Sequence, residues 1–257
     1  MSKWLKLGVI LLPLAVSPQV QASEESDPWE GFNRGVFAFN DTLDKYFLKP
    51  VATGYDRFTP QVVQTGIGNF FSNLGEVSTI INDLLQGKLK QAGLDSTRFL
   101  VNTTVGIVGL VDVGSRIGLE QHDEDFGQTF GYWGMDSGPY LMLPLLGSST
   151  VRDAFGRVPD YYISVYDTVD DESVTLALRG LDIVDTRAGL LEVEKLVAGD
   201  RYTFFREAYL QRRAFQVRDG AMDDAFLEED DGLFDDDFED DSADDASDAP
   251  SDTESDF

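Results

Sequence analysis

One stretch constrains the fold of this chain more than any other: residues 125–153, DFGQTFGYWGMDSGPYLMLPLLGSSTVRD. Glycine or proline recurs every few residues, so the backbone must turn repeatedly, and no single helical or strand period runs along the stretch. Its centre, residues 140–146, is nevertheless too apolar for a solvated loop. An irregular apolar segment has to lie in a protein core or against a lipid-like phase. We therefore expect the rest of the chain to consist of helices that hold this stretch.

The other apolar residues up to residue 218 recur mostly at helical spacing. Asp27, Pro28 and Glu30 form a helix-start signature. The first helix is expected to end near Leu48, before Pro50. Further helices are predicted at 62–74, 77–85, 88–101, 151–158, 174–198 and from 200 onward. Since no run shows clear strand alternation, the predicted fold class is mostly α.

The first predicted helix carries large apolar side chains at intervals of three and four residues, which places them on one face. They are Trp29, Phe32, Val36, Phe39, Leu43 and Phe47, and Phe37 widens the apolar surface. Such a stripe can face a protein core, or it can also meet lipid, and both alternatives stay open at this point. The small-residue segment 102–114 is too short and too interrupted to span a bilayer. A shallow interfacial position is expected for it.

The two ends of the chain differ from its centre. Residues 1–22 have the features of a cleaved secretory signal, with a basic start, a short apolar run and a small-residue site before Ser23. Residues 23–218 form the predicted folded domain. Residues 219–257 hold 19 acidic residues and no lysine or arginine, and disorder is expected there because so little apolar surface can be buried. Export to the periplasmic side of a bacterial envelope follows from the signal segment.

Composition excludes several functional classes. The net charge of −27 argues against nucleic acid as a partner, because phosphate binding needs a basic surface. The absence of cysteine excludes disulfides, thiol catalysis and lipid attachment at an N-terminal cysteine. His122 is the only histidine, so no second histidine or cysteine could complete a transition-metal site. Hydrolase, Walker and zinc-protease motifs are missing. We therefore predict a protein without catalytic residues, metal or cofactor that handles apolar material.

Several motifs occur together in the order of one known family. Residues 27–34 read DPWEGFNR, 49–52 read KPVA, 69–74 read NFFSNL and 102–106 read NTTVG. The stretch 125–153 adds DFGQT, a Trp-Gly pair, GPY and STVRD. On these motifs the chain from 27 to 218 resembles the MlaA (VacJ) family of outer-membrane proteins.

The resemblance implies a single ring-like helical domain in the inner leaflet of the Gram-negative outer membrane, with amphipathic interfacial helices and an amphipathic central channel. It also implies transport of phospholipid from the outer leaflet of that membrane to a soluble periplasmic carrier, MlaC, which maintains lipid asymmetry. A trimeric porin is the implied membrane partner, and no cofactor is implied. Members typically begin with a lipidated cysteine. Because this chain has no cysteine, anchoring on the periplasmic side of the outer membrane is expected to depend on the amphipathic helices or the porin.

Two groups of residues are candidates for lipid contact. Trp29, Phe32, Phe37 and Phe39 are expected to pack together or to face acyl chains. The predicted channel wall contains Phe126, Gly127, Gln128, Thr129, Gly131, Trp133, Gly138, Pro139 and Tyr140. Arg152 and Asp153 are predicted to form a structural ion pair or a helix cap rather than a headgroup contact. The alternative functions are a non-transporting envelope scaffold or surface-spreading factor and, third, a phospholipase.

Overall fold

The computed structural model describes residues 27–197 and 199–220. The elements are α1 (Glu30–Leu43), a π turn (Asp44–Leu48), α2 (Lys49–Phe58), α3 (Gln61–Gln86), α4 (Leu89–Thr104), α5 (Phe126–Tyr132), β1 (Tyr140–Leu143), β2 (Gly147–Thr150), α6 (Val151–Ile163), α7 (Glu172–Gly189) and α8 (Arg201–Val217), with short 3₁₀ turns between some of them. The predicted mostly α fold class is confirmed. The predicted signal segment and the predicted acidic tail beyond Gly220 lie outside the described residues.

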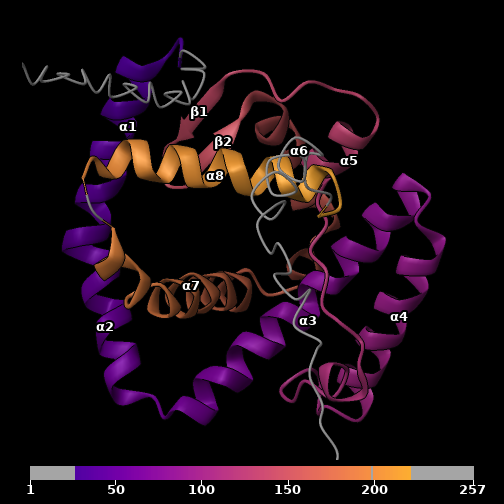
Figure 1. Ribbon diagram of the computed structural model, residues 1–257. Helices are drawn as coiled ribbons and strands as arrows, with labels where there is room; N and C mark the ends of the chain where they lie inside the picture. Colours follow the sequence, from indigo (N-terminus) through magenta and orange to yellow (C-terminus); the bar gives the residue numbers. More distant parts are fainter. Residues whose placement is uncertain (1–26, 198, 221–257) are drawn as a thin grey trace, which may run out of the picture.

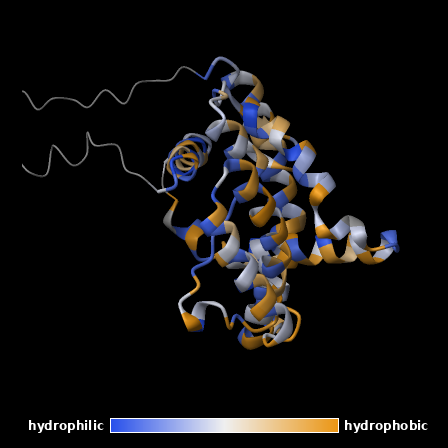
Figure 2. Cartoon of the chain, turned by 90° about the vertical axis from the view of Figure 1, so that its right-hand side faces the viewer, coloured by the Kyte–Doolittle hydropathy of each residue, from blue (hydrophilic) through white to orange (hydrophobic). Residues whose placement is uncertain are grey.

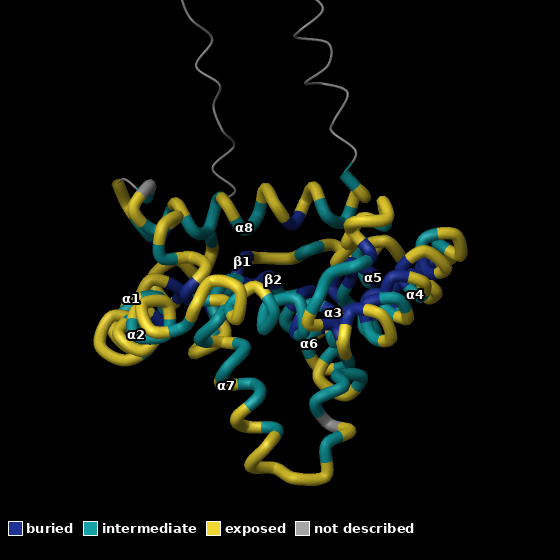
Figure 3. Tube along the Cα trace, turned by 90° about the horizontal axis from the view of Figure 1, so that it is seen from below, coloured by how far each residue is buried: buried dark blue, intermediate teal, exposed yellow. Residues whose placement is uncertain are grey.

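The helices run around a ring (Figure 1). Helices α1 and α2 form one side, α3 passes below, and α4, α5 and α6 complete the other side. Seen edge-on, the ring is a flat layer, with α8 on one face and α7 projecting from the other face (Figure 3). The strand pair β1–β2 joins the two sides of the ring beneath α8. The ring-like domain that the sequence predicts is therefore present.

Helix α1, the π turn and α2 form one continuous rod from residue 30 to residue 58. The prediction that the first helix ends near Leu48 is therefore wrong. Pro50 falls in the first turn of α2, directly after the π turn. A π turn shifts the backbone hydrogen-bond register by one residue, so a position without an N–H is accommodated there.

Three other predicted helix boundaries are corrected by tertiary packing. The segments predicted at 62–74 and 77–85 are one helix, because α3 continues through Gly75 while it packs along α4. Helix α6 continues through Pro159 at the cost of one backbone hydrogen bond. Helix α7 ends at Gly189 instead of residue 198, and a 3₁₀ turn (Val193–Leu196) follows it.

The expectation of no strand is also wrong. Strands β1 and β2 pair antiparallel, with Tyr140 opposite Thr150. Burial alternates along β1, where Tyr140 and Met142 are buried and their neighbours are half-buried. All residues of β1 are apolar, so this alternation leaves no trace in the polarity of the sequence. Leu145 and Gly147, with φ of 66° and 78°, reverse the chain between the strands.

Two asparagines of α1 bind the edge of the strand pair. The buried Asn33 donates from Nδ2 to the Tyr140 carbonyl at 3.1 Å and accepts from the Met142 N–H at 2.8 Å. Two turns later, Asn40 donates to the Leu143 carbonyl and accepts from the Leu145 N–H, both at 2.9 Å. Each amide side chain thus supplies one donor and one acceptor, as a neighbouring strand would. These contacts fix α1 against the β1–β2 pair.

The interior of the layer is mostly polar. Arg98 Nε lies 2.8 Å from Glu76 Oε1, and both side chains are almost completely buried between α4 and α3. Burial raises the pKa of Glu76 to about 7, against the lowering effect of the hydrogen bond from Arg98. One turn after Arg98, Asn102 accepts hydrogen bonds from the N–H groups of Val113 and Gly114, each at 2.8 Å. The 102–114 segment is therefore held by buried side chains.

Large apolar side chains lie outside instead. Phe47 is 67% exposed, Phe58 81%, Val62 84% and Tyr162 76%. The buried hydrophobic residues of the described chain are Ala52, Phe71, Ala92, Tyr140, Met142, Ala188 and Tyr202, and they are outnumbered by buried polar residues. Figure 2 shows hydrophobic residues spread along the helices of the flat body. Exposed apolar surface of this extent is typical of a protein that meets a partner or a membrane. Within the described residues, no helix is long and apolar enough to cross a membrane.

We predict that Asn33→Ala lowers the free energy of unfolding by about 2–4 kcal/mol. The substitution leaves a buried carbonyl and a buried N–H of β1 without their partner, and each unsatisfied group costs about 1–3 kcal/mol. Denaturant unfolding of the purified protein in detergent micelles measures the effect. Thr42→Ala on the same helix is the control, because the exposed Thr42 hydroxyl bonds only to its own helix. Equal stability of the two variants would contradict this role of Asn33.

Candidate functional site

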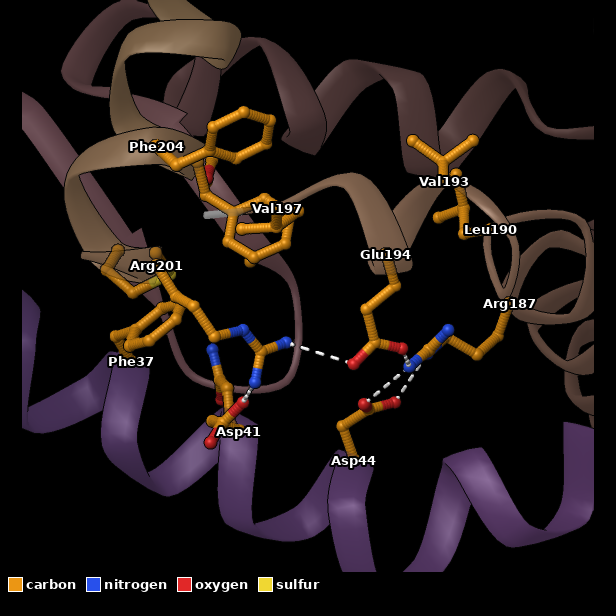
Figure 4. Close-up of a pocket in the computed structure, with 15 residues that line it drawn as sticks. Phe37, Asp41, Asp44, Arg187, Leu190, Val193, Glu194, Val197, Arg201 and Phe204 are labelled. Atoms are coloured by element: carbon orange, nitrogen blue, oxygen red, sulfur yellow. Dashed lines mark hydrogen bonds and ion pairs between the residues drawn. The ribbon is translucent and has the colours of Figure 1, made fainter. Parts of the chain in front are cut away.

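A cavity lined by both apolar and charged side chains lies on the α1 side of the ring. It has a volume of about 330 Å³ and is enclosed by α1, the π turn, the end of α7, the Val193–Leu196 turn, the start of α8 and the strand pair. Figure 4 shows the side chains of these elements pointing toward one another. The cavity therefore exists only because elements far apart in the sequence meet there.

The two walls of this cavity differ in chemistry. The apolar wall consists of Phe37, Met142, Leu190, Val193, Val197, Phe204 and Phe205. The charged wall consists of Asp41, Asp44, Arg187, Glu194 and Arg201. An amphipathic ligand, with a charged end and an apolar end, is the type of molecule that such a pair of walls accommodates.

The charged wall is a connected set of ion pairs. Arg187 binds Asp44 through Nε at 2.7 Å and Nη2 at 2.9 Å. Glu194 accepts from Arg187 Nη2 at 2.7 Å and from Arg201 Nη2 at 3.3 Å. Arg201 Nη1 reaches Asp41 Oδ1 at 2.6 Å. These bonds link α1, the π turn, α7, the 3₁₀ turn and α8 (Figure 4).

These contacts favour the ionised forms of Arg187 and Glu194. The hydrogen bond to Asp44 raises the pKa of Arg187 further above its ordinary value, with Glu194 acting in the same direction. Burial would raise the pKa of Glu194, but hydrogen bonds from Arg187 and Lys49 outweigh it and lower that pKa. The wall therefore presents fixed opposite charges beside an apolar surface.

Residues 25–216 match the sequence model of the MlaA lipoprotein family. The chain belongs to this family. It is similar to the Escherichia coli (strain K12) protein named intermembrane phospholipid transport system lipoprotein MlaA, with 36% identity over 224 residues, 85% of this chain and 89% of the relative. The Haemophilus influenzae protein of the same name is 35% identical over 223 residues, 84% of this chain and 87% of the relative.

A solved structure agrees with this assignment. The structure described as the structural basis for maintenance of bacterial outer membrane lipid asymmetry superposes with a TM-score of 0.67 at 36% identity. The match covers 75% of this chain and 99% of the other chain. The MlaA resemblance found in the sequence motifs is therefore confirmed at the level of family and fold.

The four aromatic residues predicted on the first helix occupy different places in this MlaA-family fold. Phe37 lines the cavity on the α1 side of the ring and stacks edge-on against Tyr202, with ring centroids 5.8 Å apart. Trp29 and Phe32 line a separate apolar groove between α1, β1 and α6. Phe39 is 54% exposed and lines neither the cavity nor the groove. Their contact with acyl chains stays a prediction.

The predicted channel-wall residues of α5 lie mostly in a packed interior. Thr129 donates to Asn82 Oδ1 at 2.7 Å, and Gln128 donates to the Asp123 carbonyl at 2.8 Å. At Gly127 an added Cβ would lie 2.5 Å from Asp153 Oδ1. Their role in the channel also stays a prediction.

The remaining members of that predicted wall are spread over α5 and the start of β1. A Cβ atom added at Gly131 would lie 2.8 Å from side-chain atoms of Arg152 and Val217. A Cβ atom added at Gly138 would lie 3.1 Å from the Val151 side chain. Pro139 accepts a backbone hydrogen bond from Val151, and Tyr140 is buried. Phe126 stacks against Phe130, while the half-exposed Trp133 donates to the Leu85 carbonyl. None of these residues lines the cavity on the α1 side of the ring.

Arg152 and Asp153 form the structural ion pair that the sequence predicts, since both are buried and 3.1 Å separates Arg152 Nη2 from Asp153 Oδ1. Arg213 of α8 binds both Asp153, at 3.0 Å, and Asp125, at 2.6 Å. Burial would raise the pKa of Asp153, but the Tyr209 hydroxyl and Arg213 lower it. This cluster joins α5, α6 and α8.

The surroundings of His122 do not form a metal site in the described part of the chain. Its Nδ1 atom lies 3.3 Å from Asp95 Oδ1 and 2.5 Å from Gln91 Nε2. Over residues 27–197 and 199–220, no group of three or more histidine or acidic side chains is placed to hold a metal ion.

Sequence reasoning missed the charged wall. Asp41 and Arg201 are 160 residues apart, and neither Arg187 nor Glu194 belongs to a recognisable motif. One signal was available: Asp41 and Asp44 are three residues apart on the predicted first helix, which puts two carboxylates near one face.

We predict that Gly127→Ala destabilises the fold by about 1–3 kcal/mol, the usual cost of overpacking. The added methyl group would overlap Arg213 and Asp153 and disturb the ion cluster that joins three helices. Gly35→Ala is the control, because no atom lies within 4 Å of a Cβ there, and alanine in a helix gains about 0.5–1 kcal/mol over glycine. Thermal unfolding in detergent compares the two, and an undisturbed Gly127→Ala variant would refute this packing role.

Proposed function

We propose that this protein transports phospholipid from the outer leaflet of the outer membrane toward a soluble periplasmic carrier and thereby maintains lipid asymmetry. The observation that carries the proposal is the amphipathic cavity inside the ring of a member of the MlaA family. The relatives named above are components of an intermembrane phospholipid transport system. The role we assign is that of a passage, without catalysis or cofactor.

A phospholipid matches both walls of the cavity. Its acyl chains would lie along the Phe204 and Leu190 side, where each buried CH₂ group contributes about 0.8 kcal/mol. Its phosphate would approach Arg187 and Arg201, which form strong charge-assisted hydrogen bonds with phosphate oxygens. The cavity on the α1 side thus supports the proposal more directly than α5, whose glycines serve helix packing.

The exterior of the ring supports a place in one leaflet. Exposed apolar side chains cover the α1–α2 rod and the loop at 105–110, where Ile107 and Val108 adopt φ of 57° and 58°. This backbone conformation is unfavourable for β-branched residues, and it leaves both side chains exposed. We propose that these surfaces hold the protein on the periplasmic side of the outer membrane without a lipid anchor, alone or beside a trimeric porin.

Transport predicts a specific defect in cells. Removal of the gene should raise the amount of phospholipid in the outer leaflet, as measured by surface labelling of whole cells. A plasmid copy carrying Phe204→Asp should restore asymmetry at about a tenth of the wild-type rate or less, because a carboxylate in the apolar wall opposes acyl-chain entry. Phe215→Asp, on the same helix but away from the cavity, should restore it fully.

Two outcomes would contradict this function. Unchanged asymmetry in the deletion strain would favour a scaffold or surface-spreading role. Release of fatty acid from phospholipid by the purified protein would favour an enzyme instead.

Anchoring by the apolar surface makes a separate prediction. The protein should stay in the membrane fraction after a carbonate wash, while a soluble periplasmic protein is released. It should incorporate no labelled palmitate, because the chain contains no cysteine. Complete release by carbonate would contradict an embedded ring, and palmitate incorporation would contradict anchoring without a lipid.

A further inference from the structure

Residues 190–197, here named the strap, connect α7 to the region of α8 along one side of the cavity. Over the described residues, the backbone N–H groups of the strap bond only within the strap or to the last turn of α7. Leu190 and Val193 are about half exposed. A segment with so few buried contacts opens at low cost unless another interaction holds it.

Glu194 supplies that interaction. Its Oε1 atom accepts from Lys49 Nζ at 3.1 Å and from Arg201 Nη2 at 3.3 Å, and its Oε2 atom accepts from Arg187 Nη2 at 2.7 Å. The three cations come from α2, α8 and α7. Among the described residues, Glu194 makes all the side-chain hydrogen bonds that connect the strap to other elements.

The ion cluster around Glu194 is electrically neutral only when the Glu194 carboxylate is counted. Arg187 has a second carboxylate partner in Asp44, and Arg201 has one in Asp41. Three cations therefore face three carboxylates, a net charge of zero, and removal of the strap carboxylate would leave a net charge of +1. A phosphodiester carries a single negative charge, so it restores the balance that Glu194 provides.

We propose that the Glu194 carboxylate occupies a phosphate site built by Lys49, Arg187 and Arg201, and that the phosphodiester of an entering phospholipid displaces it and frees the strap. This inference rests on the proposed function and deepens it. Carboxylate and phosphate accept the same charge-assisted bonds from guanidinium groups. The exchange therefore conserves the charge balance, and burial of acyl chains against Phe204 and Leu190 drives it.

The test measures binding to the full-length protein in a non-ionic detergent by calorimetry. The probe is dihexanoylphosphatidylglycerol, and dihexanoylglycerol has the same acyl chains without the phosphate. Glu194→Gln should bind the phospholipid about tenfold more tightly than the wild type, which corresponds to about 1.4 kcal/mol. Its affinity for dihexanoylglycerol should not change.

Glu192→Gln is the matched control. Glu192 lies on the same strap, is highly exposed and pairs only with Lys195 in the described structure. Its substitution should leave both affinities at the wild-type values. Equal phospholipid affinity of Glu194→Gln and the wild type, or an equal gain for dihexanoylglycerol, would overturn the role of Glu194.

Hydrogen exchange of the wild type gives a second test that needs no variant. Dihexanoylphosphatidylglycerol should speed amide exchange at residues 190–197, and dihexanoylglycerol should not. The same acceleration by inorganic phosphate alone would show a site for free phosphate and overturn the lipid assignment, as would slower exchange with the phospholipid. If the wild type binds no dihexanoyl lipid at all, the proposed function fails together with the inference.

Discussion

The arrangement of the ring depends on the amide side chains that fix α1 to the strand pair. Asn33 and Asn40 bind backbone groups of β1 and of the turn that follows it. Phe37 and Asp44 each come one helical turn after one of these asparagines, so the same docking points them toward the cavity. The cavity therefore takes its shape from the docking of α1 on the strand pair, and Asn40 both makes that contact and lines the cavity.

Two ion clusters have different consequences because their surroundings differ. The cluster of Asp125, Asp153 and Arg213 is largely buried, its donors and acceptors belong to packed helices, and glycines allow the close approach. Such a cluster is costly to break. The cluster around Glu194 is partly exposed and includes a short turn with few other contacts. Charges there can exchange partners, which suits a site that admits an amphipathic molecule.

The distribution of polarity explains why a small helical protein can hold a polar interior. In the membrane position that we propose, lipid would solvate the apolar exterior, so apolar side chains would need no core. Buried polar groups must then find partners within the chain, as Arg98 does with Glu76 and Thr129 does with Asn82. Within the aromatic stripe of α1, Phe37 packs against the core and Phe39 is exposed on the exterior.

The sequence by itself determined the family and the mostly α class, because local periodicity and contiguous motifs carry that information. It left open whether Arg152 and Asp153 form an ion pair or a helix cap, and the structure shows the ion pair. Only the tertiary structure decided where helices end and where the cavity lies. Buried and half-buried residues alternate along β1, but all of them are apolar, so the sequence does not show the alternation. The π turn that accommodates Pro50 has no sequence signature either. The charged wall is built from residues up to 160 positions apart. Such a site exists only after the ring has closed, so no local pattern could reveal it.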